Sequence, residues 1–181
     1  TRADSALAAA ETLITDMLQI ARMDAGDIKP SFAPVSLDSI LDDAVAQARL
    51  AAEARGIRLR YRRSHLWVQS DEKMLRRVVQ NLLDNAVKYT REGGVLIGAR
   101  RRGDAVSLEV WDTGEGIAQD QQQAIFREFC RLTPKDSSSQ RQHGYGLGLA
   151  TVERLCRLLD APIGLASVPG CGSVFRVRLP R

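Results

Sequence analysis

Three long amphipathic helical patterns, separated by short strand patterns and glycine turns, constrain the fold of this chain most strongly. The helical patterns cover residues 37–56, 72–87 and 147–159, and strand patterns cover residues 57–61, 66–68, 95–99, 106–111, 163–167 and 173–179. Tight turns at Gly103 and around Gly170 predict two hairpins. A helix with one apolar stripe must bury it, and one face of a sheet is the simplest partner. The sequence therefore predicts a two-layer α/β sandwich, a mixed sheet with helices on one face.

Local signals refine this prediction. Ser36 and Asp71 are residue types that cap helix N-termini, and each directly precedes a helical pattern. A short helix is expected at residues 119–126. The polar stretch 133–143 has no apolar periodicity and predicts a mobile loop.

Composition excludes several classes of protein. With 181 residues the chain can bury a sizeable core, and its three cysteines form neither an even set nor a CxxC pair. A disulfide scaffold and a thiolate zinc site are therefore not expected. The net charge of +4 comes mainly from arginine, but the clusters at 62–63 and 100–102 have no interleaved aromatic residues, so nucleic acid is not an expected partner. No apolar run could cross a bilayer, so this segment is expected to be a cytoplasmic part of a longer protein, with a membrane anchor elsewhere in that protein left open.

Residues 4–24 form a helical pattern of their own, with Leu7, Ile14 and Met17 on a heptad seam. Either this helix packs on its own domain, or it belongs to a bundle or dimer. A linker with prolines at positions 30 and 34 favours the second reading. The expected divisions are a helix at 1–28, a linker at 29–34 and one domain at 35–181.

The helix at 72–87 continues into a polar edge that could carry chemistry. Asn81, Asn85 and Lys88 fall within about 60° of one another around the helix axis. Amide oxygens can bind a hard cation such as Mg²⁺, and an ammonium group neutralises phosphate oxygens. The alternative is a polar edge that is simply hydrated.

Two glycine-rich segments favour a ligand site. Asp112 ends a strand, and Gly114 and Gly116 follow it, so a flat ring could lie against bare backbone while the carboxylate accepts from an exocyclic amine. The second segment has glycines at 144, 146 and 148 and opens a helix, where free N–H groups attract anions. Neither segment matches a P-loop or a dinucleotide fingerprint.

Five motifs in this order resemble those of sensor histidine kinases. Residues 81–90 resemble the N box, 112–117 the first glycine box, 125–129 the F box, 144–149 the second glycine box and 167–180 the terminal hairpin. The resemblance covers residues 35–180 and implies the Bergerat-type ATP-binding catalytic domain of the gyrase, chaperone, histidine kinase and mismatch-repair superfamily. Glu128 departs from the F box, in which many members carry proline; hybrid kinases with a receiver domain share this variant.

The resemblance assigns roles to the residues that match these motifs. Asn85 would hold Mg²⁺ with support from Asn81, and Lys88 would contact the ATP phosphates. Asn85 and Lys88 would be the catalytic residues. The remaining nucleotide contacts would come from Tyr89, Asp112, Gly114, Gly116, Ile117, Gly144, Gly146, Leu147 and Gly148. Residues 131–143 would be the ATP lid, from which Arg131, Lys135 or Arg141 could reach the γ-phosphate.

The implied function is protein-histidine kinase activity in a two-component phosphorelay, with residues 1–28 as the second helix of the dimerisation and phosphoacceptor hairpin. The expected partners are the acceptor helix of the same protein, a second copy that completes a homodimer, and a response regulator or receiver domain. Neither His65 nor His143 is followed by an acidic residue on a bundle helix, so the acceptor is expected outside this chain. The alternative is a degenerate switch that binds ATP and docks on a partner without transferring phosphate.

Overall fold

A five-stranded sheet forms the centre of the computed structural model, which describes residues 2–130 and 145–181. Its strand order is β2-β4-β5-β7-β6, with bounds Arg58–Arg62 (β2), Gly94–Arg102 (β4), Ala105–Asp112 (β5), Ile163–Val168 (β6) and Gly172–Pro180 (β7). Only the β2–β4 pair is parallel within this sheet. The two expected hairpins, β4–β5 and β6–β7, are confirmed.

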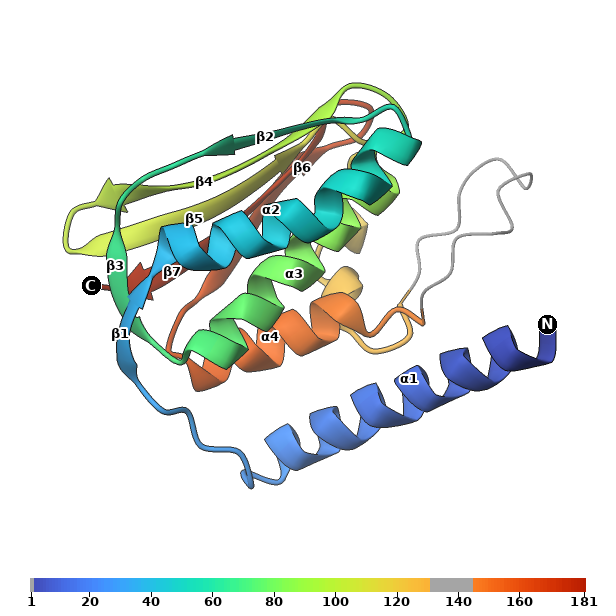
Figure 1. Cartoon of the computed structure of the whole chain (residues 1–181), viewed down its shortest axis with the longest axis horizontal. Coiled ribbons are helices and arrows are strands. Elements are labelled where there is room, and N and C mark those ends of the chain that lie inside the picture. The colour runs from blue at the N-terminus through green and yellow to red at the C-terminus, as the bar shows by residue number, and fades with distance from the viewer. Residues whose placement is uncertain (1, 131–144) are drawn as a thin grey trace.

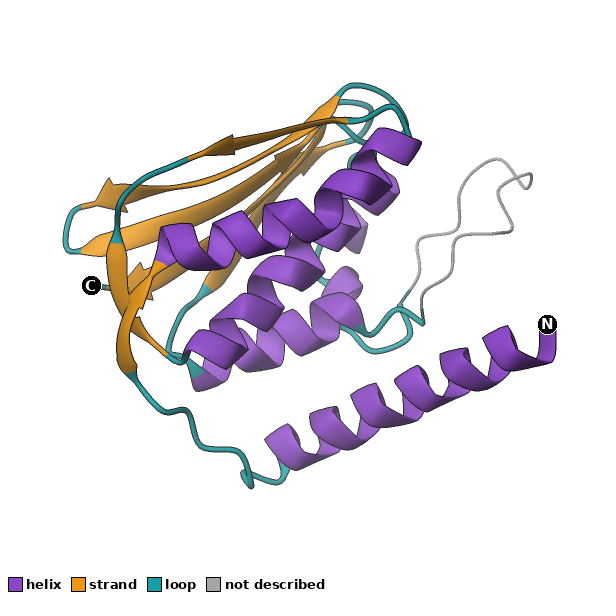
Figure 2. Cartoon of the chain, viewed as in Figure 1, coloured by secondary structure: helices purple, strands orange, loops and turns teal. Residues whose placement is uncertain are grey.

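Three helices cover one face of this sheet (Figures 1 and 2). They are α2 (Leu37–Ala54), α3 (Glu72–Tyr89) and α4 (Gly148–Leu158). Their apolar stripes are buried against the inward-facing residues of β4, β5 and β7, among them Ile97, Leu108 and Val177. The predicted two-layer sandwich is confirmed, and the opposite face of the sheet is left without a covering helix among the described residues.

A small second sheet was not expected from the sequence. β1 (Ala33–Ser36) pairs antiparallel with β3 (Trp67–Ser70), so the sheet begins inside the stretch 29–34 that the sequence assigns to a linker. Pro34 in a strand of four residues, two of them exposed, conceals the strand from any alternation pattern.

Two further local predictions need correction. Asp71 caps α3, its carboxylate accepting from the Met74 N–H at 3.0 Å, but the Ser36 side chain makes no cap hydrogen bond to α2. The expected helix at 119–126 is two 3₁₀ turns, η1 (Gln119–Gln121) and η2 (Ala124–Phe126). The backbone is extended at Ala118 and again at Arg127, and these two residues bound the stretch that holds both turns.

Helix α1 (Arg2–Asp24) confirms the expected N-terminal helix. Part of it packs on its own domain, and part of it leaves apolar residues exposed, as a bundle helix would. Ile20 and Met23, near its C-terminal end, are buried, whereas Leu7, Ile14 and Met17 on the seam are exposed. Its last turns therefore pack on the domain, and its seam is left open to a partner. No helix in the described part of the chain is long and apolar enough to cross a membrane.

An arginine on α4 joins α1 to the residue that departs from the F box. Arg154 donates through Nε and Nη2 to the Asp24 carboxylate at 2.8 and 3.1 Å, and through Nη2 to Glu128 at 2.5 Å. Its side chain is only 18% exposed. The bond from Arg154 lowers the pKa of Asp24. Glu128 thus belongs to a three-residue network that fixes the end of α1.

Replacing Arg154 with alanine is expected to loosen the last turn of α1. A network of partly exposed ion pairs contributes about 1 kcal/mol, so amide exchange at residues 20–24 should speed up about fivefold. Hydrogen exchange followed by mass spectrometry measures this. Arg157→Ala is the matched control, because Arg157 lies on the same helix and its ion pair among the described residues, at 3.9 Å, is with Glu153 and not with Asp24. Equal exchange in the two variants would show that apolar packing alone holds α1.

Residues 63–66, which connect β2 to β3, are held by one buried carboxylate. Asp38, 8% exposed, accepts from the backbone N–H groups of Ser64 and His65 at 3.0 Å each and from the Tyr61 hydroxyl at 2.7 Å. Burial alone would raise the pKa of Asp38, but these hydrogen bonds outweigh it and leave the pKa lowered. The anchored loop keeps His65 in the left-handed region at φ 53°.

Acid should release this anchor. Because the pKa of Asp38 is lower in the folded protein than its ordinary value of 3.8, its contribution to stability is complete above that value and disappears as the pH falls through the folded pKa. Asp38→Asn should therefore lower the free energy of unfolding at pH 7, with a difference from wild type that shrinks in acid. Denaturant unfolding over a pH series measures this, and Asp43→Asn, an exposed residue on the same helix that is paired with Arg76 and not with the loop, is the control. A difference that does not vary with pH would contradict the assignment.

Candidate functional site

A cavity of about 110 Å³ opens between α3, α4 and the C-terminal end of β5. Five of the residues predicted from the sequence line it: Asn85, Tyr89, Asp112, Gly116 and Ile117. The other lining residues are Ala86, Arg91, Glu115, Ile125, Cys130, Leu149, Ser173 and Phe175. The fold thus brings the end of α3, the first glycine segment and the start of α4 to one place.

Two carboxylates line this cavity: Glu115, which is paired with Arg91, and Asp112. The N–H of Gly114 donates to Asp112 Oδ1 at 2.8 Å, and the N–H of Ser173 on the neighbouring strand also bonds this carboxylate. Burial raises the pKa of Asp112 in spite of these two bonds. A half-buried carboxylate held in position by two N–H groups is suited to accept a hydrogen bond from a ligand.

The first glycine segment owes its shape to close backbone approaches. A Cβ on Gly114 would lie 2.5 Å from the Tyr89 carbonyl oxygen, so no larger residue fits. Gly116 has φ +67° and lies against the backbone of Val168 and Pro169 in the β6–β7 hairpin. The Ile117 N–H donates to Ser167 Oγ at 2.8 Å, which ties the segment to the same hairpin. Gly116 and Ile117 thus form one wall of the cavity from tightly packed backbone.

The second glycine segment meets the polar edge of α3. A Cβ on Gly148, the first residue of α4, would lie 3.1 Å from Asn81 Oδ1 and 3.7 Å from Asn85 Nδ2. Gly146 lies against the backbone of Phe129 and Cys130, and Leu147 is buried. Gly144 and the expected lid at 131–143 lie outside the described residues. Helix α4 thus begins beside both asparagines, where an anion at its N–H groups and a cation at their amides would be neighbours.

The two residues that end α3 contact each other. Lys88 Nζ lies 5.1 Å from the centre of the Tyr89 ring, which is 40% exposed. Asn81 and Lys88 do not line the cavity itself but flank it on the same helix. All the described residues that the sequence assigned to the nucleotide site therefore lie in or beside one cavity.

An ion pair at the rim of the cavity was missed. Arg91 Nε lies 2.8 Å from Glu115 Oε1, and the pair links the turn after α3 to the first glycine segment. The pairing joins residues far apart in sequence, so no local pattern could reveal it. Ile125 of the F box and Phe175 of the terminal hairpin were assigned to motifs but not to the site, although apolar side chains are the expected lining of a pocket for a flat ring.

Comparison with known sequences decides the family. The sequence profile described as "Histidine kinase-, DNA gyrase B-, and HSP90-like ATPase" matches residues 70–181. The chain belongs to this ATPase family. The match includes the N box, both glycine boxes and the terminal hairpin.

Curated relatives place the chain within the histidine kinase branch. It is 32% identical over 170 residues to the sensor-like histidine kinase SenX3 of Mycobacterium tuberculosis and 35% identical over 172 residues to the sensor protein kinase PmrB of Pseudomonas aeruginosa. These alignments cover 93% and 94% of this chain. The chain spans only 41% of SenX3 and 35% of PmrB, so it corresponds to a part of each kinase.

Solved structures agree. Full-length ShkA in complex with AMPPNP superposes with a TM-score of 0.82 at 33% identity, over 93% of this chain and 35% of that chain. The Acinetobacter baumannii histidine kinase AdeS superposes with a TM-score of 0.78 over 94% of this chain and 77% of that chain; at 18% identity it supports the fold alone. The chain therefore contains a histidine kinase ATPase catalytic domain.

Proposed function

We propose that this chain is the ATP-binding catalytic part of a two-component sensor histidine kinase and donates the ATP γ-phosphate to a histidine outside the chain. The cavity that joins α3, Asp112 and the start of α4 carries the proposal, because it unites an amine acceptor, a bare backbone wall and an anion-binding helix start. The intact asparagines, lysine and described glycines favour catalysis over a degenerate switch.

Each residue has a part in this proposal. Asp112 accepts from the adenine amino group, Gly114, Gly116 and Ile117 lie along the ring, and Tyr89 and Leu147 flank the nucleoside. Lys88 and the N–H groups around Gly146 and Gly148 hold phosphate oxygens. Gly144, the first glycine of the same segment, is proposed to contact the phosphates as well. Phosphoryl transfer is catalysed mainly by such positioning and charge neutralisation.

A magnesium ion fits the donors at the polar edge of α3. The Asn81 amide nitrogen donates to the Arg77 carbonyl at 3.0 Å, which leaves its oxygen on the side of Gly148, next to Asn85. Asn85, supported by Asn81, would hold Mg²⁺ together with phosphate oxygens, and the ion would supply neutralisation of phosphate charge. No cluster of three His, Cys, Asp or Glu exists among the described residues, so amides are the donors this chain offers there.

The domain organisation follows the same proposal. Residues 1–28 are the C-terminal helix of the dimerisation and phosphoacceptor hairpin, residues 29–34 the linker and residues 35–181 the catalytic domain. The exposed apolar side chains of α1 support pairing with the missing first helix and with a second copy: Leu7, Ile14, Met17 and Leu18 are 46% to 64% exposed. The proposed partners are the acceptor helix and a response regulator or receiver domain. The proposed location of this segment is the cytoplasm.

Nucleotide choice tests the adenine contact directly. Asp112 can accept from the amino group of adenine but would face the carbonyl oxygen of guanine, so Mg-GTP should bind about tenfold or more weakly than Mg-ATP. Titration calorimetry with both nucleotides measures the ratio. Equal affinities would contradict the assignment of Asp112 to the base-binding site. They would also contradict the proposed orientation of the nucleotide.

A further inference from the structure

The uncovered face of the sheet carries an unusual concentration of arginine. Strand alternation places Leu96 and Trp111 on this face, opposite the core residues of the same strands. In the same register it places seven arginines there: Arg58, Arg60, Arg62, Arg100, Arg102, Arg176 and Arg178. The single carboxylate among the strand residues that share this face is Glu109.

Glu109 offsets only one of these seven positive charges, and its hydrogen-bonding capacity is already used by its neighbours. It is 6% exposed and accepts from Arg100 Nε and Ser107 Oγ at 2.9 Å and from Trp111 Nε1 at 3.0 Å. Burial would raise its pKa, but these bonds outweigh it and keep the pKa lowered. Glu109 therefore stays ionised and committed to its own neighbours.

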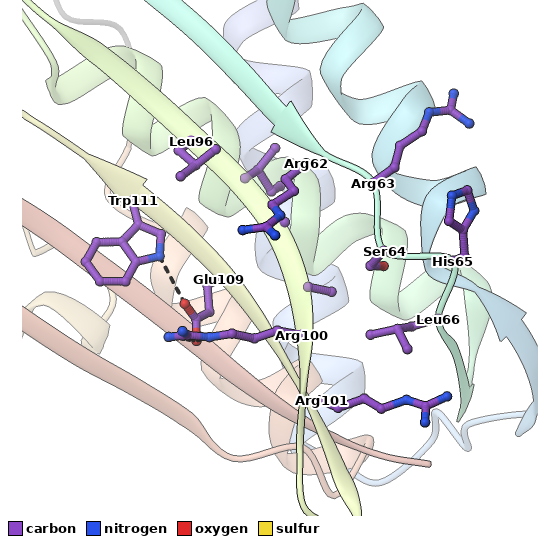
Figure 3. A pocket seen from close by; sticks show the side chains of 13 residues that line it. Arg62, Arg63, Ser64, His65, Leu66, Leu96, Arg100, Arg101, Glu109 and Trp111 are labelled. Atoms are coloured by element: carbon purple, nitrogen blue, oxygen red, sulfur yellow. Dashed lines mark hydrogen bonds and ion pairs between the residues drawn. The ribbon is translucent and has the colours of Figure 1, made fainter.

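A groove of about 840 Å³ crosses this face where β2 ends (Figure 3). β2 pairs with β4 only as far as Gly98, so residues 99–102 of β4 have no strand on that side among the described residues. The loop 63–66 forms the opposite wall, and Leu96 and Trp111 line the groove on the sheet side. Asp38 anchors this loop, so the groove exists before any partner binds.

Arginines stand on both sides of the groove. Figure 3 shows Arg62 over β4, and Arg100 and Arg101 pointing to opposite sides of the strand. In the part of the chain that the structure describes, neither Arg62 nor Arg101 has a carboxylate within salt-bridge distance, whereas Arg63 pairs with Asp42. Two exposed guanidinium groups therefore flank a free strand edge.

We propose that this groove, lined by residues 62–66 and 96–101, binds an extended acidic peptide segment of a partner protein as an added strand. Peptide N–H and C=O groups of the partner would pair with the edge at 99–102, and its carboxylates would meet Arg62 and Arg101. The arginines repel a basic strand, and an apolar strand would remove water from their guanidinium groups without replacing its hydrogen bonds. An acidic segment is therefore favoured over both.

Two other occupants fit the groove less well. A nucleic acid would need an open ring on which to stack its bases. The indole of the groove, Trp111, is 41% exposed, but Arg176 lies 5.2 Å from its centre and its N–H is donated to Glu109. A bilayer would need protruding apolar side chains, whereas Leu96 and Trp111 lie within a hollow flanked by arginines.

The test is a binding titration of the full chain with a short labelled peptide in which Glu and Asp alternate with Thr and Val. Fluorescence anisotropy should detect binding, and the same peptide with Gln and Asn should not bind. In a Trp67→Phe background, the emission of Trp111 should change on binding, because Trp111 lines the groove. N-methylation of alternate peptide bonds should abolish binding, because it removes the donors that pair with the strand edge.

Charge reversal locates the site. The double variant Arg62→Glu, Arg101→Glu should weaken the acidic peptide about tenfold or more, while Arg49→Glu, Arg127→Glu, with the same change in net charge elsewhere, should leave it within twofold. Unchanged affinity for Mg-ATP in both variants shows that they remain folded, since none of these residues lines the nucleotide cavity. Equal peptide binding by both variants would overturn the proposal, as would tighter binding of single-stranded DNA or of phosphatidylserine vesicles than of the peptide.

Discussion

Replacing Asp112 with alanine is expected to weaken the binding of Mg-ATP by about tenfold or more. The substitution removes the lining carboxylate that is not paired with an arginine, and a hydrogen bond to a charged acceptor contributes roughly 1.5–3 kcal/mol. The position of the carboxylate, fixed by the N–H groups of Gly114 and Ser173, makes the effect specific to the base. Titration calorimetry with Mg-ATP measures the change.

The same residue allows the loss of binding to be separated from a loss of fold. Burial raises the pKa of Asp112, which means that its ionised form is a cost to the folded protein at neutral pH. Asp112→Asn should therefore unfold at a temperature no lower than wild type while still binding ATP more weakly. Asp104→Ala, in the turn between β4 and β5, is the matched control and should change neither quantity. An Asp112 variant that binds ATP as wild type would place the adenine elsewhere.

The helices and hairpins could be predicted because their signals are local. The stripe from Met74 to Val87 fixes α3 and its buried face, and Asp71 marks where it starts. The short strand β1 could not be predicted, since it exists only through pairing with β3 more than thirty residues later. Ser36 illustrates a related limit: the residue type suits a cap, but its side chain makes no bond to α2.

The residues of the candidate site could be predicted where they belong to motifs that occur in a known order. Asn85 and Asp112 lie 27 positions apart in the sequence, and the match to kinase motifs, rather than spacing alone, indicated that they meet at one cavity. Partners without a motif remained hidden, such as Arg91 with Glu115 and Arg154 with Asp24. The arginine face shows the same limit. The sequence displays only small clusters, and strand pairing is what gathers arginines of β2, β4 and β7 on one surface.

This chain is expected to bind ATP yet to be unable to phosphorylate itself on histidine. Transfer needs an acceptor in line with the γ-phosphate, and a misplacement of about one ångström can already cost about a hundredfold in rate. His65 lies on the loop 63–66, whose position is fixed by Asp38, and it does not line the nucleotide cavity. His143 lies outside the described residues, and no acidic residue adjoins it in the sequence.

Supplying the missing helix should restore the reaction. A segment that carries the acceptor histidine of the dimerisation hairpin, added in trans with radiolabelled ATP, should gain acid-labile label. Asn85→Ala should abolish this transfer, because it removes the proposed magnesium ligand, while Asn81→Ala should weaken it less, since Asn81 only supports the site. Gln47→Ala, an exposed amide on α2 that bonds Gln80 at 2.6 Å, is the control and should transfer at the wild-type rate. Acid-labile label on the chain itself, lost when His65 or His143 is replaced, would place the acceptor within this chain and overturn the expectation.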